Sequence, residues 1–256
     1  MTRRVLLIIM GMLFSVCLLN MVQAETGKSA MENFFEANQA YKNDHFRQAA
    51  DGYIHLIEDG YENGHLYYNL GNAYFRLGEV GRAILYYERA SLLMPRDDDL
   101  AFNLSQARNQ TQDVESHLEI SSRHRFLGLD SVNLYEALFA FTLLYFFFFS
   151  MICIRLFKKT EWTYYLSIFL AIMISVGAFT LSLKWYAWVT DNRAIVLSEE
   201  LEVLAGPDAK DTVLFKLHVG TMVDAERNEG DWVLINLSKE KRGWVRSSQL
   251  ERIVRR

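Results

Sequence analysis

The chain has very little cysteine. It holds two in 256 residues, Cys17 and Cys153, and both lie inside apolar stretches. The polar regions that follow those stretches therefore contain no thiol. This absence excludes a disulfide, a thiolate metal site and a cysteine nucleophile from the polar regions.

Recognisable catalytic and cofactor motifs are also absent. The sequence contains no glycine-rich phosphate loop, no paired-histidine zinc motif and no Gly-x-Ser-x-Gly nucleophile elbow. No two histidines have the spacing that a helix needs to ligate a metal, and they lie scattered at His45, His55, His65, His117, His124 and His218. We therefore expect no catalytic residue, no cofactor and no metal site.

Positive charge is scarce over residues 25–130, which hold 10 Lys and Arg against 17 Asp and Glu, a difference of −7. The whole chain has a net charge of −4, and the part from residue 190 is nearly balanced. An acidic region of this kind argues against nucleic acid or an anionic lipid surface as its partner.

The amino terminus has the layout of a secretory signal peptide over residues 1–24. Arg3 and Arg4 precede an apolar run over 5–19, and residues 22–24 (Val-Gln-Ala) offer a small-residue cleavage site. An uncleaved membrane anchor is the alternative. In both cases the two arginines stay in the cytoplasm, so the residues that follow are exported.

A helical repeat is predicted over residues 30–125. Within it, residues 64–97 have the spacings of a tetratricopeptide repeat (TPR), whose period is 34 residues, at Tyr67, Leu70, Gly71, Tyr74, Ala83, Tyr87, Ala90 and Pro95. A degenerate copy lies one period earlier, over residues 30–63, at Ala37, Ala40, Ala49 and Tyr53. Small residues let two antiparallel helices approach closely, and aromatic residues fill the space between successive pairs.

A third helix is expected over residues 98–112. Acidic residues at its amino end favour the helix dipole, and Leu100, Leu104 and Ala107 form an apolar stripe. No second helix with the repeat pattern follows, so we interpret it as a cap on the second repeat. Two repeats and a cap make a minimal α-helical solenoid of marginal stability.

TPR domains bind other proteins through a concave groove lined by the first helix of each repeat. The resemblance implies a peptide-binding groove formed by Asn38, Lys42, Tyr68, Asn69, Asn72 and Arg76. Asn38 and Asn69 match two asparagines that hold a peptide's backbone or terminal carboxylate in peptide-clamping TPR domains. The cationic partners of that clamp are replaced by Phe34, Asp99 and Asn103, so a carboxylate clamp is not expected. Asparagine is also common at these positions without binding a peptide.

Two apolar segments of membrane length follow, and we expect transmembrane helices over residues 132–156 and 162–188. Either segment alone is compatible with a buried helix of a soluble protein. Flanking aromatics such as Trp162 and Trp185 favour a membrane hairpin. Its short basic turn should face the cytoplasm, which leaves both soluble regions on the exported face. So short a turn has no room for a partner domain.

Residues 192–254 contain five short β-like runs punctuated by glycines, which suggests a small all-β barrel. The Gly206-Pro207 turn, Gly-Asp-Trp-Val and Gly-Trp-Val resemble a bacterial SH3-like (SH3b) domain, although a charged tip replaces the family's frequent Asp-Gly turn. Ligands of such domains are wall peptides or protein segments. Trp232 and Trp244 are the candidate ligand platform, with barrel core as the alternative role.

The whole order is similar to the BatE proteins of the bacterial Bat (aerotolerance) group. The fold class is thus a multidomain membrane protein: a TPR solenoid, a transmembrane α-hairpin and an SH3-like barrel. The resemblance implies a scaffold on the periplasmic face of the inner membrane, whose partners are other Bat membrane proteins, several with von Willebrand A domains. Two further roles stay open: attachment to peptidoglycan through the SH3-like tail, and stabilisation of another membrane complex by the spans.

Overall fold

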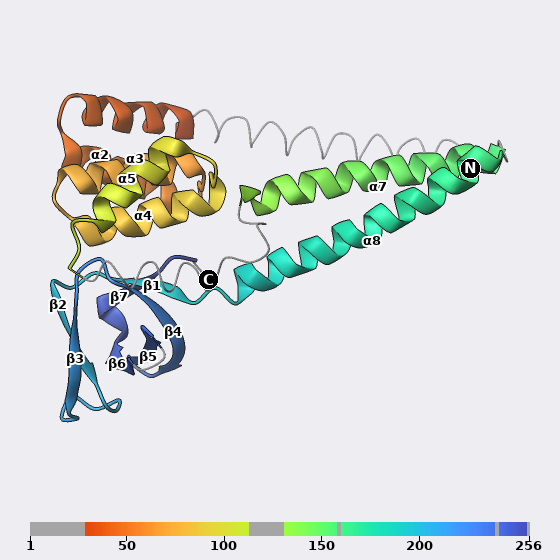
Figure 1. Cartoon of the computed structure of the whole chain (residues 1–256). Coiled ribbons are helices and arrows are strands. Elements are labelled where there is room, and N and C mark those ends of the chain that lie inside the picture. Colours follow the sequence, from red (N-terminus) through yellow and green to blue (C-terminus); the bar gives the residue numbers. More distant parts are fainter. Residues whose placement is uncertain (1–28, 113–130, 158–159, 239–240, 255–256) are drawn as a thin grey trace, which may run out of the picture.

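The computed structural model describes residues 29–112, 131–157, 160–238 and 241–254. They form a helical solenoid, a long helical hairpin and an antiparallel sheet, with the solenoid and the sheet together at one end of the hairpin (Figure 1). The predicted signal peptide lies outside the described residues. So does the end of the predicted TPR region.

The solenoid is built as the repeat pattern predicts, from a first helix over residues 29–42 followed by α2 (Phe46–Glu58), α3 (Gly64–Arg76), α4 (Val80–Leu93) and α5 (Asp98–Arg108). Asn63 and Asp97 cap α3 and α5, because each side chain accepts a backbone N–H three residues later at 2.8 Å. Gly71 lets α4 approach α3 closely, since a Cβ there would lie 2.6 Å from the Tyr87 ring.

Helix α4 is the centre of the fold. Every residue from Ala83 to Ala90 is buried, so the helix has no solvent-facing side along this stretch. Two repeats and a cap cannot enclose a helix completely. The remaining side is covered by the sheet, through contacts between α4 and β1.

The sheet has seven antiparallel strands in the order β3-β2-β6-β5-β4-β1-β7. Their bounds are β1 Arg193–Val196, β2 Glu200–Leu204, β3 Val213–His218, β4 Met222–Glu229, β5 Trp232–Asn236, β6 Arg242–Arg246 and β7 Leu250–Arg252. The five predicted runs therefore become seven strands, because the first run splits into β1 and β2 and the closing Leu-Glu-Arg pairs with β1. In this order β3 and β7 are the two ends, so the sheet is open and the predicted barrel is not confirmed.

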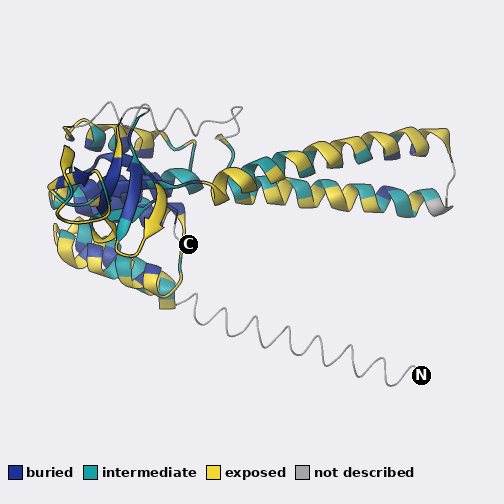
Figure 2. Cartoon of the chain, turned by 90° about the horizontal axis from the view of Figure 1, so that it is seen from below, coloured by how far each residue is buried: buried dark blue, intermediate teal, exposed yellow. Residues whose placement is uncertain are grey.

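The sheet stays open because its core is shared with the solenoid. A Cβ on Gly81 of α4 would lie 2.7 Å from Val219, and one on Gly220 would meet Ile84 at 3.0 Å. The buried residues of both parts form one continuous hydrophobic cluster, visible as the dark region in Figure 2. The predicted barrel assumed that residues 192–254 have no helix to pack against, whereas α4 packs on the sheet.

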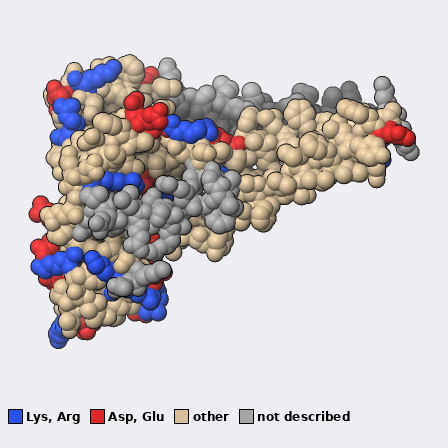
Figure 3. All heavy atoms as spheres, viewed as in Figure 1, with Lys and Arg blue, Asp and Glu red and all other residues tan. Residues whose placement is uncertain are grey.

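The hairpin consists of α7 (Leu134–Phe157) and α8 (Glu161–Val189). Both helices are long and apolar enough to cross a membrane, with mean hydropathies of 2.4 and 2.2. Only 6% of each apolar window is buried inside the protein, whereas a core helix of a soluble protein would be mostly buried. Figure 3 shows a hairpin surface almost without charge between its root and its far tip.

The root of the hairpin is bonded to the end of α4 and the turn after it. Asn133 Nδ2 donates to the Leu93 carbonyl at 2.9 Å, and the Arg96 guanidinium pairs with Glu136 at the start of α7. Lys184 of α8 donates to the Val132 carbonyl. The start of α7 is therefore bonded to the solenoid, and α8 is bonded to the segment that precedes α7.

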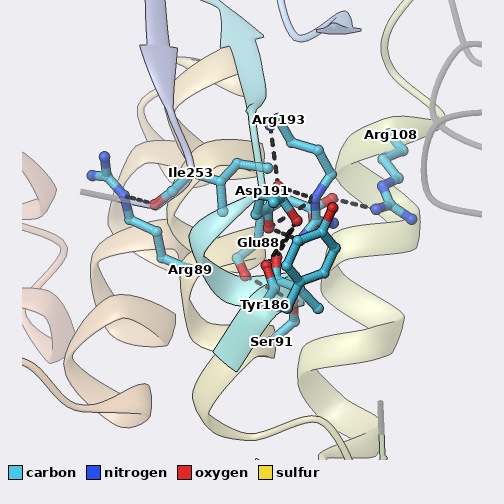
Figure 4. A network of polar contacts seen from close by, with 10 residues as sticks. Glu88, Arg89, Ser91, Arg108, Tyr186, Asp191, Arg193 and Ile253 are labelled. Atoms are coloured by element: carbon cyan, nitrogen blue, oxygen red, sulfur yellow. Dashed lines mark hydrogen bonds and ion pairs between the residues drawn. The ribbon is translucent and has the colours of Figure 1, made fainter. Parts of the chain in front are cut away.

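A buried ion-pair network joins the three parts of the protein (Figure 4). Glu88 of α4, 2% exposed, pairs with Arg108 of α5 and, at 3.7 Å, with Arg193 of β1. Arg193 also holds Asp191, which follows α8, at 2.7 Å. Burial alone lowers the pKa of the Arg193 guanidinium, but the hydrogen-bonded Asp191 carboxylate, with Glu88, raises that pKa overall. Arg193 is thus held in its charged form.

A second buried arginine fixes the carboxy-terminal strand. Arg89 Nε donates to the Ile253 carbonyl at 3.0 Å, and its Nη2 donates to the Arg252 carbonyl and to Glu251, both at 2.8 Å. Glu88 and Arg89 are neighbours on α4. Two consecutive residues of α4 therefore bind two different parts of the carboxy-terminal region, Arg193 in β1 and the segment around Ile253.

We expect Arg193→Ala to lower the free energy of unfolding of the full chain by about 3–5 kcal/mol, because it removes the arginine that pairs with the buried Asp191 carboxylate and one of the two that pair with Glu88. Urea unfolding in detergent, followed by tryptophan fluorescence, measures this. Lys216→Ala is the control: it removes an exposed ion pair with Glu200 and should hardly move the unfolding midpoint. Equal effects of the two substitutions would contradict a large contribution of the buried network to the free energy of unfolding.

Candidate functional site

The first repeat contains a polar unit that joins its two helices to the next repeat. The Tyr53 hydroxyl on α2 donates to Asn38 Oδ1 at 2.6 Å. Asn69 Nδ2 on α3 donates to the same oxygen at 3.0 Å. The amide oxygen of Asn38 is therefore occupied by two donors, one from each neighbouring helix.

The second repeat contains the same unit one period further along. The Tyr87 hydroxyl on α4 donates to Asn72 Oδ1 at 2.7 Å, and Asn103 Nδ2 on α5 donates to it at 3.0 Å. The sequence separations, 15 and 31 residues, are identical in the two units. Asn103 Nδ2 also reaches the Tyr68 hydroxyl at 2.9 Å.

The tyrosines of these units remain donors. Burial raises the pKa of both Tyr53 and Tyr87 well above the ordinary value for a phenol. Burial also raises the pKa of Tyr68, against the lowering effect of its hydrogen bond with Asn72, and the Asp99 carboxylate adds to the increase. Because a protonated phenol donates a hydrogen bond, Tyr53 and Tyr87 hold the asparagine oxygens at neutral pH.

All three predicted groove asparagines thus have a structural role. Asn38, Asn69 and Asn72 join one repeat to the next, which supports the alternative reading of these positions. The Nδ2 group of Asn38 has no hydrogen-bond partner among the described residues, so it retains two N–H donors for a further acceptor, whereas Asn72 also shares a hydrogen bond with Tyr68.

A row of aromatic residues accompanies the asparagines on the first helix of each repeat. Phe34, Tyr68 and Phe102 lie one period apart. The Phe34 ring packs 5.9 Å from Tyr53, and the Tyr68 ring packs 6.0 Å from Tyr87. Phe102 is exposed. The sequence reading did not assign Phe34 or Phe102 to the groove, although their spacing of one period was a usable signal.

The two predicted cations lie one helical turn after the asparagines. Lys42 is exposed. The Arg76 guanidinium stacks 4.2 Å over the Phe46 ring and approaches Asp44 at 3.4 Å, so its charge is partly offset. Since residues four apart share a helix face, amide, aromatic and cationic groups are brought together on the first helices.

The two predicted platform tryptophans lie on the same face of β5 and β6. Trp232 lies opposite Arg246, and Leu234, two residues further along β5, lies opposite Trp244. Since cross-strand partners and residues two apart share a face, both tryptophans lie on the same side of the sheet. Trp244 is 7% exposed and is covered by the Arg227 guanidinium at 5.2 Å. Trp232 is half-buried beneath Arg246 at 4.7 Å. A platform on this face would therefore consist mainly of Trp232.

The two candidate surfaces offer amide N–H donors, aromatic rings and cations. Within the described ranges, no group of three or more His, Cys, Asp or Glu side chains is placed to hold a metal ion.

Comparison with known proteins supports the repeat. The family profile of the tetratricopeptide repeat matches residues 64–97. Tetratricopeptide repeats are typically interaction modules without catalytic activity, so protein binding is the function that this match suggests. No curated protein matches the chain at a significant level.

The structural role of the asparagines can be measured. Asn72→Leu removes the acceptor of the buried Tyr87 hydroxyl, and we expect the free energy of unfolding to fall by about 1–3 kcal/mol. Lys42→Ala on the same face should leave the unfolding curve unchanged, because its side chain is exposed. Urea titration of both full-length variants tests this, and an unchanged stability of Asn72→Leu would refute the role.

Proposed function

We propose that the chain is a non-enzymatic adaptor, anchored in the bacterial inner membrane, that holds segments of partner proteins in the groove of its TPR solenoid. The observation that carries the proposal is the repeated row of Phe34, Tyr68 and Phe102 beside the asparagine amides. Aromatic rings accept apolar side chains, and the N–H donors of the Asn38 amide suit a main-chain carbonyl.

The arrangement of the parts supports one common side of the membrane for both soluble regions. The solenoid and the sheet share a core and adjoin the same end of α7 and α8. If these helices cross a membrane, neither soluble region can lie on the opposite side from the other. The basic turn and the predicted signal peptide favour the periplasm as that side.

The resemblance to BatE proteins suggests the setting of this activity. It favours a Bat-type membrane complex, with partners among the von Willebrand A-domain proteins of that group. The SH3-like region then serves as a second contact surface. Because it shares its core with α4, its position relative to the groove is fixed, and one partner can contact both.

The groove is tested by substituting exposed side chains that take no part in the asparagine–tyrosine units. In Lys42→Glu/Phe102→Ala, an exposed cation and an exposed ring are lost without disturbing the asparagine units. We expect crosslinking in native membranes, followed by pull-down, to recover the wild-type partner at least about tenfold less well, as loss of an aromatic anchor implies.

Lys210→Glu/Val213→Ala is the matched control, since it changes one exposed cation and one exposed apolar residue on the sheet. It should recover the partner normally. A loss confined to this control would assign the partner to the sheet and contradict the groove.

The side of the membrane is tested by labelling single cysteines in a background with Cys17 and Cys153 replaced by serine. Glu58→Cys and Lys210→Cys should react with a membrane-impermeant maleimide in cells with a permeabilised outer membrane. Thr160→Cys, in the turn of the hairpin, should react only after lysis. Labelling of Thr160→Cys alone in intact cells would reverse the orientation.

The half-buried Trp232 supports a second candidate function, attachment to peptidoglycan through the SH3-like region. In that case the purified full chain should sediment with isolated sacculi, and Trp232→Ala should abolish the sedimentation. Since Trp232 lies apart from the groove, Lys42→Glu/Phe102→Ala should sediment like the wild type. Failure of the wild-type chain to sediment would dismiss this alternative.

A further inference from the structure

The first helix has an outer surface that the groove does not use. A hollow of about 600 Å³ lies between this helix and the start of α2, and we call its lining the end face: Met31, Glu32, Phe35, Glu36, Gln39, Ala40, Asn43, His45 and Gln48. Two large apolar side chains stand open on it, with Met31 70% and Phe35 62% exposed. An exposed apolar pair beside a hollow is a feature of docking surfaces.

The repeat pattern identifies this surface as the side on which solenoid helices stack. Phe35 occupies the position of Asn69 and Asn103, one and two periods later. Those two residues reach back to the preceding repeat, to Asn38 and Asn72. The end face therefore has the shape of a helix-packing surface without a preceding helix in the described structure.

The composition of the end face differs from that of the matching surface of the second repeat. At the positions where the second repeat buries Leu66, Leu70 and Ala73, the first repeat has Glu32, Glu36 and Gln39. A further apolar repeat is therefore not the natural occupant, because it would bury two carboxylates. Neither carboxylate has an ion-pair partner among the described residues, and the lining contains no lysine or arginine.

These charges decide between the remaining occupants. A second copy of the chain, docked by a two-fold axis, would bring two further carboxylates into the interface and no lysine or arginine from the same lining to neutralise them, which is unfavourable. A helix with basic flanks would neutralise them. Residues 31–43 extend about 18 Å along the helix axis, which accommodates about three turns of a packed helix.

We propose that the end face binds an amphipathic helix of a partner protein. Its apolar stripe packs on Met31 and Phe35, and its lysine or arginine side chains pair with Glu32 and Glu36. This contact is separate from the groove, so the solenoid can hold two partner segments at once.

The test uses the full chain in non-ionic detergent with a photoreactive p-benzoylphenylalanine in place of Met31. The probe is a synthetic helical peptide with a leucine stripe flanked by lysines, and its comparison peptide has glutamates in place of the lysines. Crosslinked yield against peptide concentration gives the affinity. We expect saturable crosslinking of the lysine peptide that weakens with salt, and none of the glutamate peptide.

Glu32→Lys/Glu36→Lys should weaken binding of the lysine peptide at least about tenfold, as reversal of two facing charges implies. Glu58→Lys/Glu62→Lys is the matched control, with the same net charge and both changes at exposed sites away from the end face. Lys42→Glu/Phe102→Ala should also bind normally, which separates this surface from the groove.

Three results would overturn the proposal. They are equal crosslinking of the two peptides, no effect of Glu32→Lys/Glu36→Lys, and crosslinks that join two copies of the chain. Circular dichroism of each variant shows that a lost crosslink does not reflect a lost fold.

Discussion

Glu88 is a carboxylate on a helix that is enclosed on every side, and arginines from two other parts of the chain neutralise it. Without Arg108 and Arg193 the burial of this charge would cost several kcal/mol. The pairing therefore links α4 to the cap helix and to the start of the sheet, and through Asp191 to the end of α8. The solenoid, the sheet and the hairpin root are connected in this way, although each has its own sequence pattern.

This dependence has consequences for recognition. A solenoid of two repeats buries too little apolar surface to hold a rigid groove by itself. The sheet completes the cover of α4, and the asparagine–tyrosine units fix the spacing of successive helices. The rings of Phe34 and Tyr68 pack on the same tyrosines that hold the asparagines, so the proposed groove and the framework share residues.

The sequence predicted local structure well where one pattern dominated. The TPR period located the helix pairs, and the length of the apolar runs located α7 and α8. The asparagines show the limit of the same reasoning. The pattern located Asn38 and Asn72 on the first helices of the two repeats, but it could not tell a side chain that donates to a ligand from one that accepts a structural hydrogen bond. That difference depends on whether the hydroxyls of Tyr53 and Tyr87 reach them, and those hydroxyls lie on other helices.

By itself, the sequence determined the periodic features: the helical repeat, the two membrane-length helices, the short strands and the lack of thiols in the soluble parts. Each of these depends on residues close together in the chain. Only the tertiary structure decided that the sheet remains open, that Glu88 and Arg89 connect the solenoid to the strands, and that the end face carries, beside Met31 and Phe35, two carboxylates that pair with none of the described residues. These features depend on which distant surfaces meet, because the burial of a charge or a ring is set by its neighbours in space.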